Sequence, residues 1–151
     1  MNKTLKVILI VLGVIVGIFI IGIALSSFAS HSSEKLSQKI DVSVVRTDKA
    51  DSVSDVTYSI TNTSEKTLKL NSIDINMKAF EQAELVNVNE QRTDEYTTFG
   101  MRAFEFMKKI EPGETASIVF TFKRRTPTTQ FIDTDICMSQ GGICMGRSFD
   151  L

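Results

Sequence analysis

The two cysteines of the chain, Cys137 and Cys144, carry its most reactive side chains and lie close together in the sequence. Gln140 and Gly141 stand between them, and such a pair is typical of a tight turn. Two strands joined at this turn would place the sulfur atoms opposite each other. We therefore expect a structural disulfide, worth about 2 to 3 kcal/mol in the chain-entropy account of so short a loop. Two free thiols are the alternative.

Other uses of the cysteine pair have less support. The spacing differs from the C-x-x-C pattern of redox-active pairs, and no activating base lies nearby in the sequence. A zinc site would need further nitrogen or sulfur ligands, yet the whole chain has one histidine and two cysteines. We predict no metal site.

Catalytic patterns are also scarce. The single histidine, His31, lies in a polar stretch, where we expect a solvated side chain. Because the chain has no second histidine, we do not expect a Ser-His-Asp, Cys-His or HExxH arrangement in a compact site. The sequence also has no glycine-rich phosphate loop. We predict no catalytic residue and no cofactor, and we expect a protein that is not an enzyme.

Carboxylates are the remaining chemical groups. Asp133 and Asp135 alternate along one predicted strand, but their sequence lacks the spacing of a calcium loop. Only the fold could bring them near the aspartates of an earlier segment, which are Asp41, Asp48, Asp51 and Asp55. A carboxylate- or metal-dependent enzyme, or an accessory subunit of a membrane enzyme complex, is therefore the alternative function.

One basic cluster, formed by Lys123, Arg124 and Arg125, ends the apolar run at Ile118–Phe122. These side chains could contact anionic lipid head groups or block a strand edge against pairing with another chain. We favour the second use. The formal net charge of the chain is −1, and no acidic residue precedes residue 30. A nucleic-acid partner is not expected, because its binding needs a concentrated cationic surface.

These groups must be positioned by two kinds of element, and the first is an apolar segment. Residues 7–25 have no charged, amide or hydroxyl side chain. About 20 apolar residues in a helix cross the hydrocarbon core of a bilayer, so we predict a transmembrane anchor over residues 7–29. The alternative is a signal peptide cleaved after Ala29, which would release a secreted domain.

The flanks of the apolar segment predict its orientation. Lys3 and Lys6 precede it, so residues 1–6 should stay in the cytoplasm. The polar segment 30–37 is predicted to be a tether, and residues 38–151 a domain outside the cytoplasm, held at the cell membrane.

The second kind of element is the β-strand. Apolar and polar residues alternate along several short runs, which is typical of half-buried strands. Turn-forming residues separate the runs, for example at Glu111–Glu114, and the alternation shifts by one residue near Asn71. The runs are Ile40–Val44, Val56–Ile60, Leu68–Met77 and Ile118–Phe122. We predict an all-β fold, an antiparallel sandwich of about seven strands preceded by the transmembrane helix.

Residues 79–109 are less regular. A strand around Leu85–Val88 competes with the end of a helix, and the spacing at Phe99–Met107 fits either period. The following turn favours a strand that ends near Lys109. We expect the polar run Asn89–Thr98 to be the longest loop of the domain.

Two stretches resemble bacterial immunoglobulin-like or fibronectin-type-III-like domains. Val56–Ser64 with Thr67–Leu70 is similar to their second and third strands, and Ile110–Phe120 is similar to their proline-glycine turn entering a late strand. The resemblance covers residues 40–124 and implies an immunoglobulin-like sandwich. It implies no particular activity, because this fold carries many functions. The chain lacks the tryptophan and inter-sheet cysteines of antibody domains.

We therefore expect a non-catalytic, single-pass membrane protein that presents a β-sandwich outside the cytoplasm. Its partners would be the membrane and another protein, bound through loops or a strand edge. The anchor would raise the local concentration of the domain at the membrane.

Overall fold

The computed structural model describes residues 39–125, 130–139 and 142–151, and its central strands β2 and β7 alternate between buried and more exposed residues. The first elements are β1 (Ile40–Asp48), β2 (Val53–Asn62), β3 (Leu68–Asn76), α2 (Lys78–Gln82) and β4 (Ala83–Val88). The later strands are β5 (Asp94–Thr98), β6 (Met101–Ile110), β7 (Thr115–Arg124), β8 (Phe131–Met138) and β9 (Ile143–Asp150).

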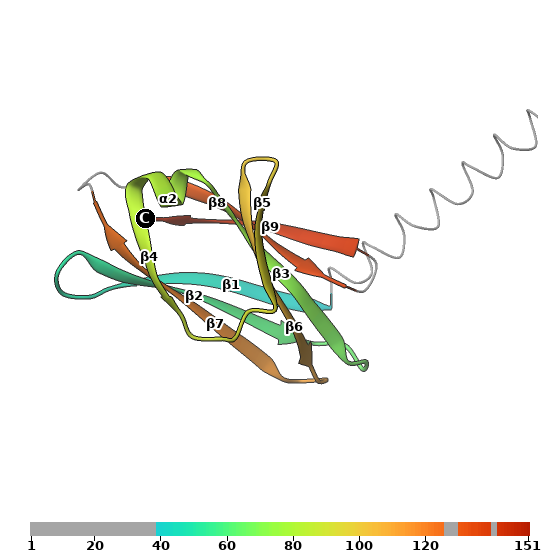
Figure 1. The fold of residues 1–151 in the computed structure, drawn as a ribbon. Coiled ribbons are helices and arrows are strands. Elements are labelled where there is room, and N and C mark those ends of the chain that lie inside the picture. Colours follow the sequence, from blue (N-terminus) through green and yellow to red (C-terminus); the bar gives the residue numbers. More distant parts are fainter. Residues whose placement is uncertain (1–38, 126–129, 140–141) are drawn as a thin grey trace, which may run out of the picture. The chain divides into compact units, whose positions relative to one another are not determined.

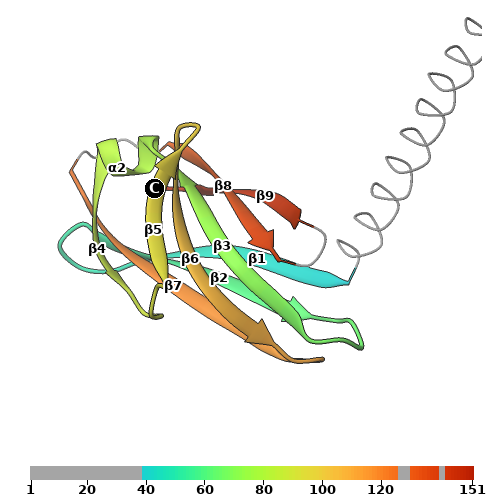
Figure 2. The same cartoon turned by 45° about the vertical axis from the view of Figure 1, so that its right-hand side comes forward.

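The strands form two antiparallel sheets that pack face to face (Figures 1 and 2). A four-stranded sheet has the order β1-β2-β7-β4, and a five-stranded sheet has the order β5-β6-β3-β8-β9. The all-β prediction and the two-layer prediction are confirmed. The described residues contain nine strands, so the prediction of about seven was too low.

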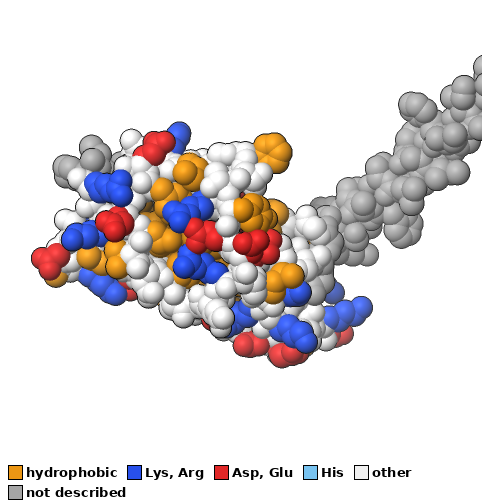
Figure 3. Space-filling model, viewed as in Figure 1, with side chains coloured by type: hydrophobic (Ala, Val, Ile, Leu, Met, Phe, Trp, Pro, Cys, Tyr) orange, Lys and Arg blue, Asp and Glu red, His pale blue; other side chains and the backbone are white. Residues whose placement is uncertain are grey.

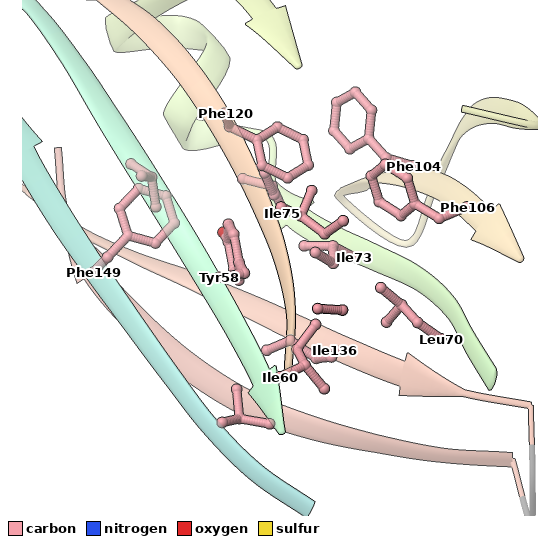
Figure 4. Close-up of a cluster of buried hydrophobic side chains, with 14 of the residues drawn as sticks. Tyr58, Ile60, Leu70, Ile73, Ile75, Phe104, Phe106, Phe120, Ile136 and Phe149 are labelled. Carbon is pink, nitrogen blue, oxygen red and sulfur yellow. The ribbon is translucent and has the colours of Figure 1, made fainter. Parts of the chain in front are cut away.

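Aromatic rings fill the centre of the core between the sheets (Figure 4). The ring of Phe120 packs edge-on against Phe104 and Tyr58, with centroids 5.1 and 5.4 Å apart. The buried Tyr58 hydroxyl donates a hydrogen bond to Thr134 Oγ1 at 3.3 Å. Burial raises the pKa of Tyr58 far above its ordinary value, so the phenol stays neutral. Each such buried aromatic contributes on the order of 1.5 to 3 kcal/mol.

The predicted shift near Asn71 is confirmed as a β-bulge in β3. The register toward both β6 and β8 is interrupted between Leu70 and Ser72. Toward β8, Asn71 is an extra residue with no partner in the register. Toward β6, Asn71 lies opposite two residues, Phe106 and Met107, and Met107 has a φ of 53°. Because neighbouring residues of a strand face opposite sides, the extra residue keeps the apolar side chains on both sides of the bulge in the core.

The region between residues 79 and 109 corrects one prediction. The strand expected around Leu85–Val88 is β4, and the strand expected to end near Lys109 is β6. The prediction of a loop over Asn89–Thr98 is wrong for its second half, because Asp94–Thr98 forms β5. β5 and β6 are joined by Phe99 and Gly100, both with positive φ. Such turns usually have the sequence Asn-Gly or Asp-Gly. Because this turn has Phe-Gly instead, the sequence did not predict the hairpin.

The buried side chain of Asn62 connects the β2–β3 turn to β6 through hydrogen bonds. Asn62 Nδ2 donates hydrogen bonds to the backbone oxygens of Lys66 and Ile110, at 2.8 and 2.9 Å. Its Oδ1 accepts from the backbone N–H and the hydroxyl of Ser64. All four hydrogen-bonding positions of this amide are used, which ties the β2–β3 turn to β6.

Side chains close one lateral side of the sandwich, between β1 and β9. Arg147 Nε donates to the backbone oxygen of Val42 at 3.3 Å, and Arg46 Nη1 donates to that of Asp150 at the same distance. The edge strands of the opposite side are β4 and β5. The candidate site lies there.

Several predictions lie outside the described residues. These are the anchor over 7–29, the cleavage after Ala29, the tether over 30–37 and the environment of His31. Among the residues that are described, no helix is long and apolar enough to cross a membrane.

Candidate functional site

A cavity of about 440 Å³ opens between the edge strands β4 and β5. Figure 3 shows basic and acidic side chains gathered over hydrophobic atoms on this face of the molecule. The cavity is lined by Phe80, Ala83, Glu84, Leu85, Val86, Asn87, Val88, Arg92, Glu95, Arg102 and Arg125. We call it the β4–β5 cavity.

The floor of the β4–β5 cavity is apolar. α2 brings the half-buried ring of Phe80 to within 6.1 Å of the Phe104 ring and 6.0 Å of the Phe122 ring, measured between centroids. Leu85 and Val88 of β4 also pack against the core. Apolar side chains therefore lie at the base of the cavity, below the arginines that also line it.

Arg102 is held above this floor. Its guanidinium lies 4.7 Å from the centroid of the Phe80 ring and 5.4 Å from that of Phe104. Arg102 Nε donates a hydrogen bond to Glu95 Oε1 at 2.7 Å, and its Nη2 contacts the same oxygen. Stacking on aromatic faces and pairing with a carboxylate both restrict the rotation of a guanidinium.

Arg92 reaches the same carboxylate from the loop before β5. Its Nη1 pairs with Glu95 Oε2, and its guanidinium lies 5.8 Å from the Phe104 centroid. Glu95 therefore bridges two arginines. These ion pairs are partly exposed, and each alone would contribute little stability, but together they set the positions of two cationic groups.

Arg125 is the third arginine of the β4–β5 cavity. Its backbone N–H donates to the backbone oxygen of Gln82 at 2.8 Å, which fixes the main chain beside α2. Within the described part of the chain, its exposed side chain makes no hydrogen bond or ion pair. Arg125 lines the cavity together with Arg92 and Arg102.

The basic cluster predicted from the sequence is thus divided. Lys123 and Arg124 belong to β7, which has β2 on one side and β4 on the other. A strand paired on both sides has no free edge, so the edge-blocking prediction does not apply to them. Arg125 lies past the end of β7 and lines the cavity.

Sequence reasoning missed Arg92 and Arg102 as site residues. They belong to the loop before β5 and to β6, and folding alone brings them to Glu95. The sequence contained one indication of Arg102, which is its core-facing position in the alternating pattern of β6. In the structure, Arg102 lies opposite the core residue Ile75 in the β3–β6 register. A charged residue at such a position needs a partner.

The cysteine pair lies on the opposite half of the five-stranded sheet. Cys137 and Cys144 are directly opposed in the β8–β9 register, and their sulfur atoms are at disulfide distance, 2.00 Å. Cys137 is buried and Cys144 is exposed. The bridge joins β9, an edge strand, to its neighbour in the sheet.

The aspartates predicted as a possible cluster are not brought together. Asp133 and Asp135 lie on β8, whereas Asp41, Asp48 and Asp55 lie on β1 and β2 of the other sheet. In the described residues, no group of three or more His, Cys, Asp or Glu side chains could hold a metal ion.

Asp135 instead faces Asp74 of β3 across the sheet. Asp74 Oδ1 is buried and has no hydrogen-bond partner among the described residues, and its Oδ2 lies 3.7 Å from Cys137 Sγ. Burial raises the pKa of Asp74, the neighbouring Asp135 and Glu105 raise it further, and a hydrogen bond from Ser72 opposes the shift.

We expect Asp74→Asn to stabilise the domain at neutral pH. A raised pKa means that the folded state binds more protons than the unfolded state above the ordinary aspartate pKa of about 3.9. The free energy of unfolding therefore falls as the pH rises through the folded pKa. Urea unfolding between pH 3 and pH 8 should show the variant above the parent at neutral pH and close to it in acid.

Asp133→Asn is the matched control, since Asp133 lies on the neighbouring strand β8, is exposed, and accepts a hydrogen bond from Ser148 Oγ at 3.2 Å. Equal stabilisation by both variants would contradict the role of burial, because it would show a general relief of negative charge.

Comparison with known proteins identifies no relative in sequence. No protein-family model matches the chain, and a search of curated proteins found no match. Structural likenesses are distant, and their TM-scores are too low to carry a conclusion about this chain.

Three solved structures illustrate these likenesses. The FixG-related protein from Vibrio parahaemolyticus has a TM-score of 0.44 and 12% identity, covering 75% of this chain and 94% of that one. The GH20 exo-β-N-acetylglucosaminidase from Vibrio harveyi has a TM-score of 0.44 and 8% identity, covering 73% of this chain and 17% of the enzyme. The Northeast Structural Genomics Consortium target SoR45 has a TM-score of 0.45 and 16% identity, covering 77% and 88%.

Proposed function

We propose that this protein is a non-catalytic, single-pass membrane protein that binds a protein partner outside the cytoplasm through the β4–β5 cavity. The observation that carries the proposal is the cavity itself. It combines an apolar floor, three arginines and two strand edges that no other described strand covers. Sheet edges of this kind are ready to pair with another chain.

The strand order supports an immunoglobulin-like classification of the sandwich. Immunoglobulin domains place strands A, B, E and D in one sheet and C, F and G in the other. The order β1-β2-β7-β4 has the first pattern, and β3-β8-β9 has the second. The β5–β6 hairpin is an addition beside β3, and it supplies one wall of the cavity.

The membrane location is inferred from the sequence alone. The uncharged segment 7–25 supports an anchor, and the preceding lysines support a cytoplasmic amino terminus. Protease added to intact cells should remove a tag at the carboxy terminus, and mass spectrometry should find the amino terminus intact. A protected tag would contradict the orientation, and a mature chain starting at Ser30 would contradict the anchor.

Site-specific cross-linking tests the binding function. A photoreactive amino acid at Val86, which is 56% exposed on β4 at the cavity, should trap one partner in cells that produce the full chain. The same substitution at Val45 is a matched control, because Val45 is 55% exposed on β1, at the other edge of the same sheet. We expect a discrete adduct from position 86 and none from position 45.

The proposal would be wrong if position 86 produced no adduct or if both positions produced the same adducts. Turnover of a substrate by the purified full chain would favour the enzymatic alternative instead.

A further inference from the structure

The guanidinium groups of the β4–β5 cavity have more hydrogen-bond donors than the described residues satisfy. Each arginine has five N–H donors. Arg102 uses Nε and Nη2 on Glu95, and Arg92 uses Nη1 on the same carboxylate. The side chain of Arg125 uses none within the described residues. Three arginines face two glutamates, Glu84 and Glu95, around one cavity, so the cavity has an excess of one positive charge.

An anionic group beside an apolar group would complement this cavity. A carboxylate can accept paired hydrogen bonds from one guanidinium in a planar arrangement. Among the described residues, the side chain of Arg125 has no hydrogen-bond partner, whereas Arg92 and Arg102 are already oriented by Glu95. The aromatic ring of Phe80 and the side chain of Leu85 offer a surface for a neighbouring aliphatic or aromatic group.

The free edge of β4 indicates what carries these groups. β4 pairs with β7 on one side and with no described strand on the other. An extended chain that paired with this edge would have alternate side chains directed toward and away from the core. The register of β4 with β7 is interrupted between Leu85 and Asn87, and Val86 between them is more than half exposed.

We propose that the β4–β5 cavity binds an extended polypeptide segment of the partner, with an aspartate or glutamate side chain paired to Arg125 and an apolar side chain seated on Phe80 and Leu85. This inference rests on the proposed function and names the chemistry of the partner segment. A second copy of this chain and a free anion are the other possible occupants, and the experiment separates them.

Selection from a phage-displayed library of random 12-residue peptides tests the inference. The bait is the full chain in detergent micelles. Enriched peptides should share an acidic residue close to an aliphatic or aromatic one, and synthetic versions should bind more weakly as salt is added. Arg125→Ala should weaken their binding by about tenfold or more, as expected for the loss of a charge-assisted contact.

Lys123→Ala is the matched control. Lys123 belongs to the same basic cluster but does not line the cavity, so its removal should change the affinity by less than about twofold. Arg125→Glu should reverse the selection toward basic peptides. This variant keeps the inference testable even if alanine at this position disturbs the loop.

Four outcomes would overturn the inference. In the selection, either no peptide is enriched or the enriched peptides lack acidic residues. In the binding measurements, either both alanine variants weaken binding equally, or the peptides share no apolar residue and inorganic phosphate displaces them completely. Dimers of the full chain that dissociate on Arg125→Ala would assign the cavity to a second copy. If position 86 still cross-links a partner while selected peptides lack acidic residues, the proposed function stands and the acidic segment is wrong.

Discussion

Replacing Phe120 with alanine should lower the free energy of unfolding by about 3 to 5 kcal/mol. Phe120 is fully buried, and its ring contacts four other rings. These belong to Tyr58, Phe104, Phe106 and Phe122. Because a domain of this size is stabilised by only about 5 to 15 kcal/mol in total, the variant should lose a large share of its stability. Urea unfolding followed by circular dichroism measures the change.

Two further variants make the Phe120 result specific. Phe120→Leu keeps most of the apolar volume and should cost clearly less than the alanine variant. Phe99→Ala removes the same kind of ring from a hairpin tip where it is 101% exposed, so it should change the stability little. A loss at Phe99 comparable to that at Phe120 would contradict the assignment of the core.

Removal of the disulfide is the second large effect. The double variant Cys137→Ser, Cys144→Ser should lower the free energy of unfolding by about 2 to 3 kcal/mol, since the bridge restricts the unfolded chain. It should act mainly on the β8–β9 hairpin, because both cysteines belong to it. Thermal and urea unfolding of protein prepared without reductant measure the change.

Reductant is the control for the disulfide. Adding it to the parent should reproduce the loss, and adding it to the double variant should have no effect. Two titratable thiols in the parent protein prepared without reductant would contradict the bridge. Peptide binding at the β4–β5 cavity should survive in the folded double variant, because β9 and β5 are the opposite edges of the five-stranded sheet.

Local patterns in the sequence were sufficient for the described strands other than β5. The alternation at Val56–Ile60 and Ile118–Phe122 predicted β2 and β7, and its interruption near Asn71 predicted the bulge in β3. The turn residues between Cys137 and Cys144 predicted that the two would face each other. Such features depend on neighbours a few residues apart, so the sequence displays them directly.

The candidate site depends on contacts that the sequence does not display. Whether a strand is central or at an edge follows from the order of strands in a sheet, which placed Lys123 in an interior strand and left Arg125 at the cavity. β5 escaped prediction because its turn uses Phe99 rather than the usual asparagine or aspartate.

The sequence by itself determined that an apolar segment precedes a β-rich domain, that the cysteines share a hairpin, and that no familiar catalytic motif is present. Only the tertiary structure decided which edges stay uncovered and which charges meet there. Arg92, Glu95 and Arg102 come together because β5 folds back on β6 at the open side of the sandwich. The physical reason is that side-chain alternation is a local property of each strand, whereas the order of strands is set by packing between distant segments.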